Sequence, residues 1–288
     1  MSSTGRMQQN LGMTFALKRV WLWTLLMAAY SALTLFKPYI ESLIKSHLLV
    51  FDIPDVSFGM EAALTFVMGM LILFRINRAY ERWWEARTLW GTLVNVSRNL
   101  AVKTKQLVDV DAANREDMRR LIVDFCHALK DHLRGPIQLP SGRSSPNSGD
   151  DSGHVPIAIV QKIYKKLKTW SRAGALTREE LWMMDSEARM LLEICGACER
   201  IKSTLMSRSW RLLTRQCLGV YLLVAPWALV DEFNYWTIPL SALIAYFVIG
   251  GEGIAHYVEE PFGLQEDHLD LDGICNKIEV SVGDILSD

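Results

Sequence analysis

Four long blocks of apolar residues stand out from the mixed pattern of the rest of the chain. They cover residues 20–36, 57–74, 217–230 and 235–251. A helix needs roughly 20 mostly apolar residues to cross the hydrocarbon core of a bilayer, and the first two blocks approach that length. The last two blocks are shorter, and they contain Pro226 and Pro239. Length alone therefore leaves two interpretations open, membrane spans or buried core helices.

The charged residues that flank the blocks favour membrane spans. Basic residues precede the first block, follow the second and precede the third, whereas only Asp231 and Glu232 lie between the third and the fourth. Between the first and second blocks, Lys37 and Lys45 are outnumbered by acids. Because short cytoplasmic loops carry an excess of Lys and Arg, this alternation predicts four spans with both termini in the cytoplasm.

The first block has a second interpretation, a cleaved signal peptide. A basic start precedes it, and Ala29 and Ser31 offer small residues near its end. However, its apolar run is long for the core of a signal peptide, and removing it would leave three spans and spoil the alternation of charge. We therefore expect an uncleaved first span.

The pattern between residues 75 and 210 predicts helices but no further span. Apolar residues recur at helical spacing in four segments, which are 79–108, 112–135, 157–174 and 176–203. Thr177 and Glu180 have the spacing of a capping box, and Asp111 and Gly174 suit helix ends. Strand-like alternation occurs nowhere in the sequence, so the expected fold class is all-α.

We expect four regions along the chain. They are an N-terminal segment with the first two spans and the start of the cytoplasmic helix (1–92), a helical cytoplasmic region (93–210), the last two spans (211–258) and a C-terminal cytoplasmic segment (259–288). The stretch near 136–155 is rich in Ser, Gly, Pro and Asp and predicts a flexible loop. The chain has no internal repeat, which argues against a secondary transporter.

Composition argues against several other functions. The chain has 288 residues, of which 50% are hydrophobic and 22% charged, and its net charge of −1 gives no sign of a nucleic-acid partner. Its five Cys residues have no framework spacing for disulfides. Cys195 and Cys198 form a CxxC pair on a predicted helix, but no second pair and no neighbouring His completes a metal site. We expect neither a metal nor a cofactor.

One face of the second block is a candidate functional surface. Ala62, Phe66 and Met70 recur every four residues and therefore share a face, with Gly59 and Gly69 nearby. The ordinary interpretation is helix–helix packing, for which glycines allow close approach. The alternative is that several copies of this helix surround an axis, so that the face forms apolar rings that constrict a pore and gate it by dewetting.

Charged residues border this face at both ends. Glu61 is the one acid inside the block, which makes it a candidate for an outer vestibule charge, although it lies about 100° around the helix from Ala62. Arg75, Arg78 and Arg82 share a face just inside the predicted membrane. We expect this inner basic face to bind lipid headgroups.

Three motifs give the sequence a family resemblance. TFVMGMLILFRINRAYERWWEARTLWG (65–91) resembles the second span and following helix of the bestrophin family of ion channels, in its bacterial branch. GACERI (196–201) precedes the third span, and EEPFG (259–263) follows the fourth, in the order typical of the family. The resemblance covers nearly the whole chain, and it is the combination of motifs that is specific.

The resemblance implies a bestrophin-like homopentamer around a central pore, in a bacterial inner (plasma) membrane. The family's hydrophobic neck falls on Ala62, Phe66 and Met70, and a second, cytoplasmic aperture falls near Leu176. The arginine- and tryptophan-rich helix would continue the pore helix below the membrane. The implied partners are other copies of the chain, membrane lipids and permeating monovalent ions.

The sign of the permeating ion stays open on the residues. The family label is anion or chloride channel, and the inner arginines agree with it. An acidic outer vestibule would favour cations, so a monovalent cation (sodium) channel of the same architecture is the alternative. The acids that could contribute are Glu61, Asp52, Asp55, Asp231 and Glu232. A membrane scaffold without transport is a further alternative.

The segment after the fourth span bears on two other hypotheses. In calcium-binding relatives a run of acids follows the same motif, but here the acids are spaced out, at Glu266, Asp267, Asp270 and Asp272. We instead expect Glu259 and Glu260 to pair with the basic face. An enzyme would need a set such as His256, Glu260 and Glu252, but no nucleophile or metal set accompanies them, so we expect no enzymatic activity.

Overall fold

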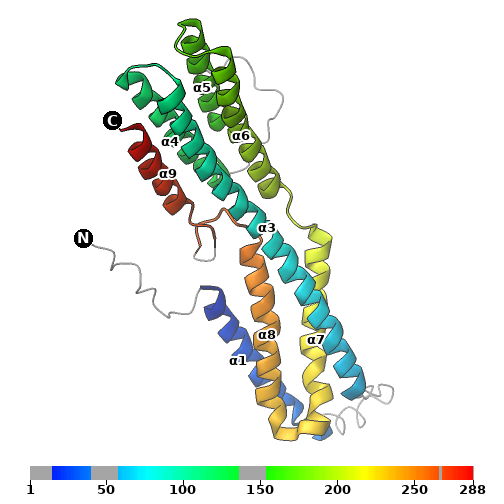
Figure 1. The fold of residues 1–288 in the computed structure, drawn as a ribbon. Helices are drawn as coiled ribbons and strands as arrows, with labels where there is room; N and C mark the ends of the chain where they lie inside the picture. Colours follow the sequence, from blue (N-terminus) through cyan, green and yellow to red (C-terminus); the bar gives the residue numbers. More distant parts are fainter. Residues whose placement is uncertain (1–14, 40–57, 136–153, 266–267, 288) are drawn as a thin grey trace, which may run out of the picture. The chain divides into compact units, whose positions relative to one another are not determined.

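The computed structural model describes residues 15–39, 58–135, 154–265 and 268–287, and every regular element in these ranges is a helix (Figure 1). In chain order the elements are α1 (Phe15–Thr34), α3 (Phe58–Leu107), α4 (Ala112–Arg134), α5 (Val155–Arg172), α6 (Arg178–Ser203), α7 (Arg208–Phe233), the 3-10 helix η1 (Asn234–Trp236), α8 (Thr237–Val258) and α9 (Leu271–Leu286). The prediction of an all-α fold is confirmed. The predicted loop at 136–155 lies almost entirely outside the described residues.

The helices divide into two compact units. The first unit comprises Met1–Glu81 and Met206–Glu259, and the second comprises Arg82–Leu205 and Glu260–Asp288. Helix α3 has 50 residues and contributes to both units, so the second apolar block passes into the arginine- and tryptophan-rich segment without a break in the helix.

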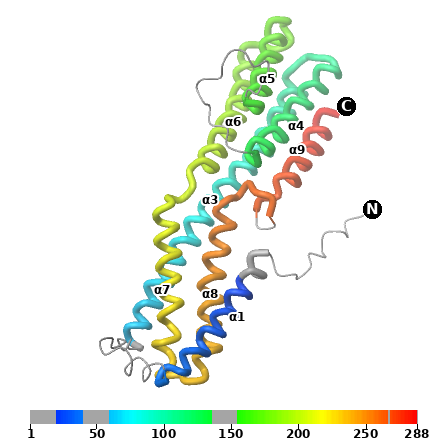
Figure 2. The backbone as a smooth tube through the Cα atoms, turned by 180° about the vertical axis from the view of Figure 1, so that it is seen from behind, coloured from blue at the N-terminus to red at the C-terminus, as the bar shows by residue number. Residues whose placement is uncertain are grey.

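In the first unit, α1, α7, α8 and the start of α3 form a bundle. Helix α1 lies beside α8 in both views (Figures 1 and 2). The Trp227 indole donates to the Tyr30 hydroxyl (2.7 Å), which in turn donates to the Leu223 carbonyl (2.9 Å), and these bonds join α7 to α1. Gly251 lets α8 approach α3 closely, because a Cβ built there would lie 3.0 Å from the Ile72 side chain.

The polarity of this unit is unusual for a water-soluble bundle. Two described stretches, Gly59–Leu107 and Arg208–Val258, contain windows apolar enough for a span, and only 17% and 28% of those windows are buried. The buried apolar cluster is small and consists of Met68, Leu218, Tyr221 and Ala225. Large apolar side chains such as Val220, Leu223 and Phe247 are exposed instead. Most of the apolar surface of this unit therefore faces outward.

The second unit has the opposite arrangement. Helices α4, α5, α6, α9 and the end of α3 enclose a large apolar cluster that includes Trp90, Phe125 and Leu191, all with no exposed surface. The predicted helix ends are confirmed. The Asp111 side chain accepts from the backbone of Asn114, and Thr177 and Glu180 form both bonds of the capping box.

Candidate functional site

The predicted apolar face of α3 is uncovered in the single chain. Ala62, Phe66 and Met70 are all exposed, and the Phe66 side chain leaves 71% of its surface accessible. A Cβ built on Gly59 or Gly69 would meet nothing within 4 Å. The structure thus brings the three predicted neck residues onto one open helical face.

The opposite face of the same helix packs against the rest of the first unit. Its buried residues are Glu61, Met68, Arg75 and Ala79, which recur at seven-residue or four-residue spacing. Met68 lies about 200° around the helix from Phe66, so the packing face and the open face point in opposite directions. The open face is therefore free of contacts with the packing helices of the first unit.

Glu61 belongs to the packing face. It is buried and lies against α7, where its Oε1 accepts from the Thr65 hydroxyl (2.8 Å) and from the Tyr221 hydroxyl (3.3 Å). The two hydroxyls also lie 2.8 Å apart, which closes a three-membered polar cluster. Hydrogen bonds of this kind are what a carboxylate needs inside an apolar bundle. The carboxylate is therefore directed into the protomer rather than onto the open face.

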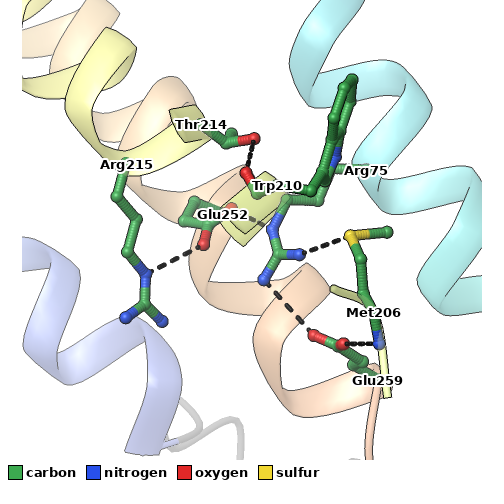
Figure 3. Close-up of polar contacts among 7 residues, drawn as sticks. All are labelled: Arg75, Met206, Trp210, Thr214, Arg215, Glu252 and Glu259. Atoms are coloured by element: carbon green, nitrogen blue, oxygen red, sulfur yellow. Dashed lines mark hydrogen bonds and ion pairs between the residues drawn. The ribbon is translucent and has the colours of Figure 1, made fainter. Parts of the chain in front are cut away.

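Arg75 forms a buried ion-pair cluster near the junction of α3, α7 and α8 (Figure 3). Only 1% of its side chain is exposed, and its guanidinium pairs with Glu252 through Nε and with Glu259 through Nη2 (3.4 Å). Its Nη1 also contacts the Met206 sulfur at 3.3 Å. The prediction that Arg75 binds lipid headgroups is wrong, because two acids from the end of α8 draw it into the bundle.

The cluster is balanced in charge and closed by further contacts. Glu252 also faces Arg215 of α7 at 3.5 Å, so two basic groups oppose two carboxylates. The other oxygen of Glu259 accepts from the backbone N–H of Met206 (3.2 Å), just before α7 begins (Figure 3). The cluster therefore links α3, the start of α7 and the end of α8. The expectation that Glu259 pairs with the basic face is confirmed at Arg75.

Comparison with known proteins identifies the family of the chain. A family model described as Bacterial/Fungal Bestrophin protein matches residues 14–284. The chain belongs to the bacterial and fungal bestrophin family. A voltage-dependent anion channel-forming protein of Mesorhizobium japonicum is 30% identical over 225 residues, which cover 77% of this chain and 72% of that protein. A protein of the same name from Nostoc sp. is 30% identical over 230 residues, which cover 77% of this chain and 75% of that protein.

Solved structures show the same fold. A point mutant of a bacterial bestrophin homologue from Klebsiella pneumoniae superimposes with a TM-score of 0.80 at 22% identity, and the match covers 94% of this chain and 100% of that one. A second point mutant of that homologue also gives a TM-score of 0.80, at 21% identity. At this level of identity the likeness concerns the fold.

The other residues of the predicted basic face differ from one another. Arg78 is exposed at the surface of this bestrophin and pairs with Glu81 (3.1 Å). Arg82 belongs to the second unit, where its guanidinium donates to the carbonyls of Ile201 (2.7 Å) and Thr204 at the end of α6. Carbonyls at a helix C-terminus lack intrahelical donors, so Arg82 caps α6. Of the three arginines, Arg78 alone keeps the expected exposed position.

Leu176, the residue near the expected cytoplasmic aperture, is buried in the single chain. Its side chain is 3% exposed and belongs to the apolar cluster of the second unit, immediately before the capping box of α6. In the single chain Leu176 is therefore a core residue, and the aperture expected near it stays a prediction. Its place in the core follows from Ala175, whose backbone N–H bonds to the Trp170 carbonyl (3.0 Å) as the chain turns from α5 to α6.

Two of the acids that follow α8, Asp270 and Asp272, have partners within the second unit. Asp270 caps α9 by accepting from the backbone of Gly273, and Asp272 pairs with Lys130 (2.9 Å) and Arg134 (2.8 Å) of α4. These hydrogen bonds from Lys130 and Arg134 lower the pKa of Asp272. Glu266 and Asp267 lie outside the described residues. Glu252, considered above for an enzyme, is held in the Arg75 cluster.

The sequence pattern also missed a cluster in the second unit. His132 and His154 both approach Glu199, which follows Cys195 by one helical turn. No motif marks this set, because its two histidines lie 67 and 45 residues from the carboxylate. The one local signal was the CxxC pair of Cys195 and Cys198 beside Glu199. It could not identify the two histidines, because they are distant in sequence.

Proposed function

We propose that this chain forms a homopentameric ion channel of a bacterial inner membrane, with a hydrophobic neck built from the open face of α3. Four segments of the first unit span the bilayer, namely α1, the start of α3, α7 and α8. The second unit lies in the cytoplasm together with both termini. The partners of each chain are other copies of the same chain, surrounding lipids and the permeating ions.

The exposure of Phe66 carries this proposal. An apolar side chain with 71% of its surface open is ordinary when isolated, but here it continues into Ala62 and Met70 along one helical face. Five copies that turn this face inward would form three apolar rings around an axis. Such rings hold back ions because water leaves a narrow apolar constriction readily.

The distribution of charge supports the orientation. Asp231 and Glu232 lie where α7 ends and α8 begins, whereas the exposed Arg215 lies about two turns after the start of α7, toward the opposite end of the helix. Lys37 pairs with Asp231 (2.5 Å), which reduces the positive charge at that end. Exposed basic residues are thus concentrated toward the end of the bundle that we assign to the cytoplasm.

We propose that the permeating ion is a small monovalent anion. The relatives named above are called anion channel-forming proteins, and the turn of Glu61 toward Tyr221 removes one acid from the pore face. The rival reading is a sodium channel with the same rings, because an uncharged neck has no sign preference of its own. A scaffold without transport is the other rival.

Reconstitution of the purified chain in planar bilayers tests these readings together. Under a tenfold gradient of KCl, an anion channel reverses at a potential of about 59 mV with the sign of the chloride equilibrium potential. A reversal potential of the opposite sign would assign the channel to cations. Absence of unitary currents in a preparation that is pentameric by native mass spectrometry would favour the scaffold, and a monomeric preparation would exclude a pore on an axis.

A further inference from the structure

Three side chains that could ligate a metal meet inside the second unit. His132 lies in the last turn of α4, His154 is the N-cap of α5, and Glu199 lies on α6. The Nε2 atoms of His132 and His154 lie 2.8 Å and 2.5 Å from the same Glu199 Oε1, and one ligand atom from each residue lies within 4.8 Å of the other two. The two imidazole rings are 4.3 Å apart.

We propose that His132, His154 and Glu199 form a site for a divalent transition metal, and that Zn²⁺ is the best-suited ion. Two imidazole nitrogens and one carboxylate oxygen are a ligand set that Zn²⁺ accepts, with water in the fourth position. The hard ions Mg²⁺ and Ca²⁺ prefer oxygen ligands and are disfavoured by two imidazoles. This site is independent of the ion-conduction proposal above.

The geometry requires only a small rearrangement. Ligand atoms about 2.1 Å from a tetrahedral Zn²⁺ lie about 3.4 Å from one another, so each of the two histidine nitrogens must move away from Glu199 Oε1 by less than about 1 Å. The side chains of His132, His154 and Glu199 are 26%, 30% and 37% exposed, so an ion can reach them from solvent. Three helices fix their backbones, which limits the reorganisation.

Metal binding would change the hydrogen bonds of the His154 ring. The backbone N–H of Ile157 donates to His154 Nδ1 at 3.4 Å, so without metal the ring proton lies on Nε2 and points to Glu199. Zn²⁺ on Nε2 requires that proton to move to Nδ1, which breaks this long hydrogen bond without net proton release from the ring. Lys202 is directed to the backbone carbonyls of His132 (3.1 Å) and Gly135.

A thiol lies beside the same carboxylate. The Cys195 thiol donates to Glu199 Oε1 at 3.6 Å from one turn away on α6, but its sulfur does not belong to the group of ligand atoms that lie within 4.8 Å of one another, so water remains the fourth ligand. Metal binding would also constrain the packing of three helices. A bound metal would tie the start of α5 to α4 and α6 in addition to the hydrogen bonds to Glu199 and the apolar packing that already join these helices.

Metal titration of the full-length protein in detergent tests the site. After chelator treatment, we expect one Zn²⁺ per chain by elemental analysis and a rise in Tm of about 5 °C or more when Zn²⁺ is about 100-fold above Kd. Changes to residues that only support a ligand weaken metal binding about 10–100-fold. His154→Gln and Glu199→Gln remove ligands and should each weaken Zn²⁺ binding by at least that much.

His127→Gln is the matched control, because His127 is a half-buried histidine on the same helix α4 that lies outside the cluster. It should bind Zn²⁺ like the unaltered protein. Substitution of Co²⁺ in the unaltered protein needs no variant and should give the intense visible absorption of a tetrahedral site. Unchanged affinity in His154→Gln, or a weak octahedral Co²⁺ spectrum, would overturn the proposal.

Discussion

The two units of this bestrophin place the same types of side chain in opposite positions. In the first unit Arg75 is buried among carboxylates, while Leu223 and Phe247 face outward. In the second unit Arg200 pairs with Glu85 at the surface (2.7 Å), while Leu191 is fully enclosed. The comparison indicates that the two surfaces meet different surroundings, since apolar side chains on the outside are favourable in hydrocarbon and unfavourable in water.

The largest effect is expected from the buried Arg75 cluster. Arg75→Leu removes the cation between Glu252 and Glu259 and should destabilise the protein by about 3–5 kcal/mol, because a buried charge is left without its partner. Thermal unfolding in detergent, followed by Trp fluorescence, measures the loss. Arg200→Leu is the control in the second unit, and its exposed pair should contribute at most about 1 kcal/mol. Equal losses of stability in Arg75→Leu and Arg200→Leu would contradict the proposed difference between the buried cluster and the exposed pair.

A pair of identical substitutions compares the apolar side chains directly. Leu191→Ala creates a cavity in the enclosed core of the second unit and should destabilise the protein by about 2–5 kcal/mol. Leu223→Ala shortens an exposed side chain on α7 and should change stability by less than about 1 kcal/mol. Chemical unfolding of both variants in the same detergent gives the difference. A larger loss for Leu223→Ala would show that α7 is packed against something other than lipid or detergent.

The open face of α3 should matter for conduction more than for stability. Phe66→Ala removes the largest side chain of the proposed neck and should raise single-channel conductance about twofold or more, because a wider apolar constriction holds water more readily. Phe247→Ala is the matched control, since Phe247 is 66% exposed on α8 and lies outside the neck. Unaltered unitary current in Phe66→Ala, with both variants still assembled, would remove Phe66 from the constriction.

The smallest effect concerns the exposed pairs of Asp272. Its pKa is lowered by hydrogen bonds from Lys130 and Arg134, so its contribution to stability is present above the ordinary value of 3.8 and is lost as pH falls through the lowered value. Asp272→Asn should therefore reduce stability by about 0.5–1 kcal/mol at pH 7, discounted for exposure. The difference in Tm between the two proteins at pH 7 should shrink as the pH falls below 3.8. Asp284→Asn, on the same helix, is the control and should leave Tm close to that of the unaltered protein.

Patterns of local spacing predicted much of the fold. The capping box of Thr177 and Glu180, the cap at Asp111 and the continuous helix through residues 75–92 all depend on neighbours within a few residues, and the structure contains them. The face of Ala62, Phe66 and Met70 likewise follows from helical spacing, and its exposure in the single chain agrees with the expectation. Its role in a neck remains a prediction.

Local spacing could not place residues whose surroundings come from distant segments. Arg75 and Arg78 are three residues apart and look equivalent on the helix, but only Arg75 meets the acids of α8. Leu176 lies in a turn whose sequence does not show whether its side chain faces the core or the outside. Its burial is set by α4, α5 and α6 together, through the apolar cluster of the second unit.

The sequence by itself determined that the chain is helical, where its apolar blocks lie and which face of the second block is apolar, because these follow from periodicity and length. Tertiary structure decided which charges are buried, where Leu176 and Glu61 point, and that His132, His154 and Glu199 meet. Those outcomes depend on contacts between residues up to 184 positions apart, as for Arg75 and Glu259, and no local pattern records such contacts. A pair of charges is stabilised by the neighbour it meets in space, and only the packing of the helices selects that neighbour.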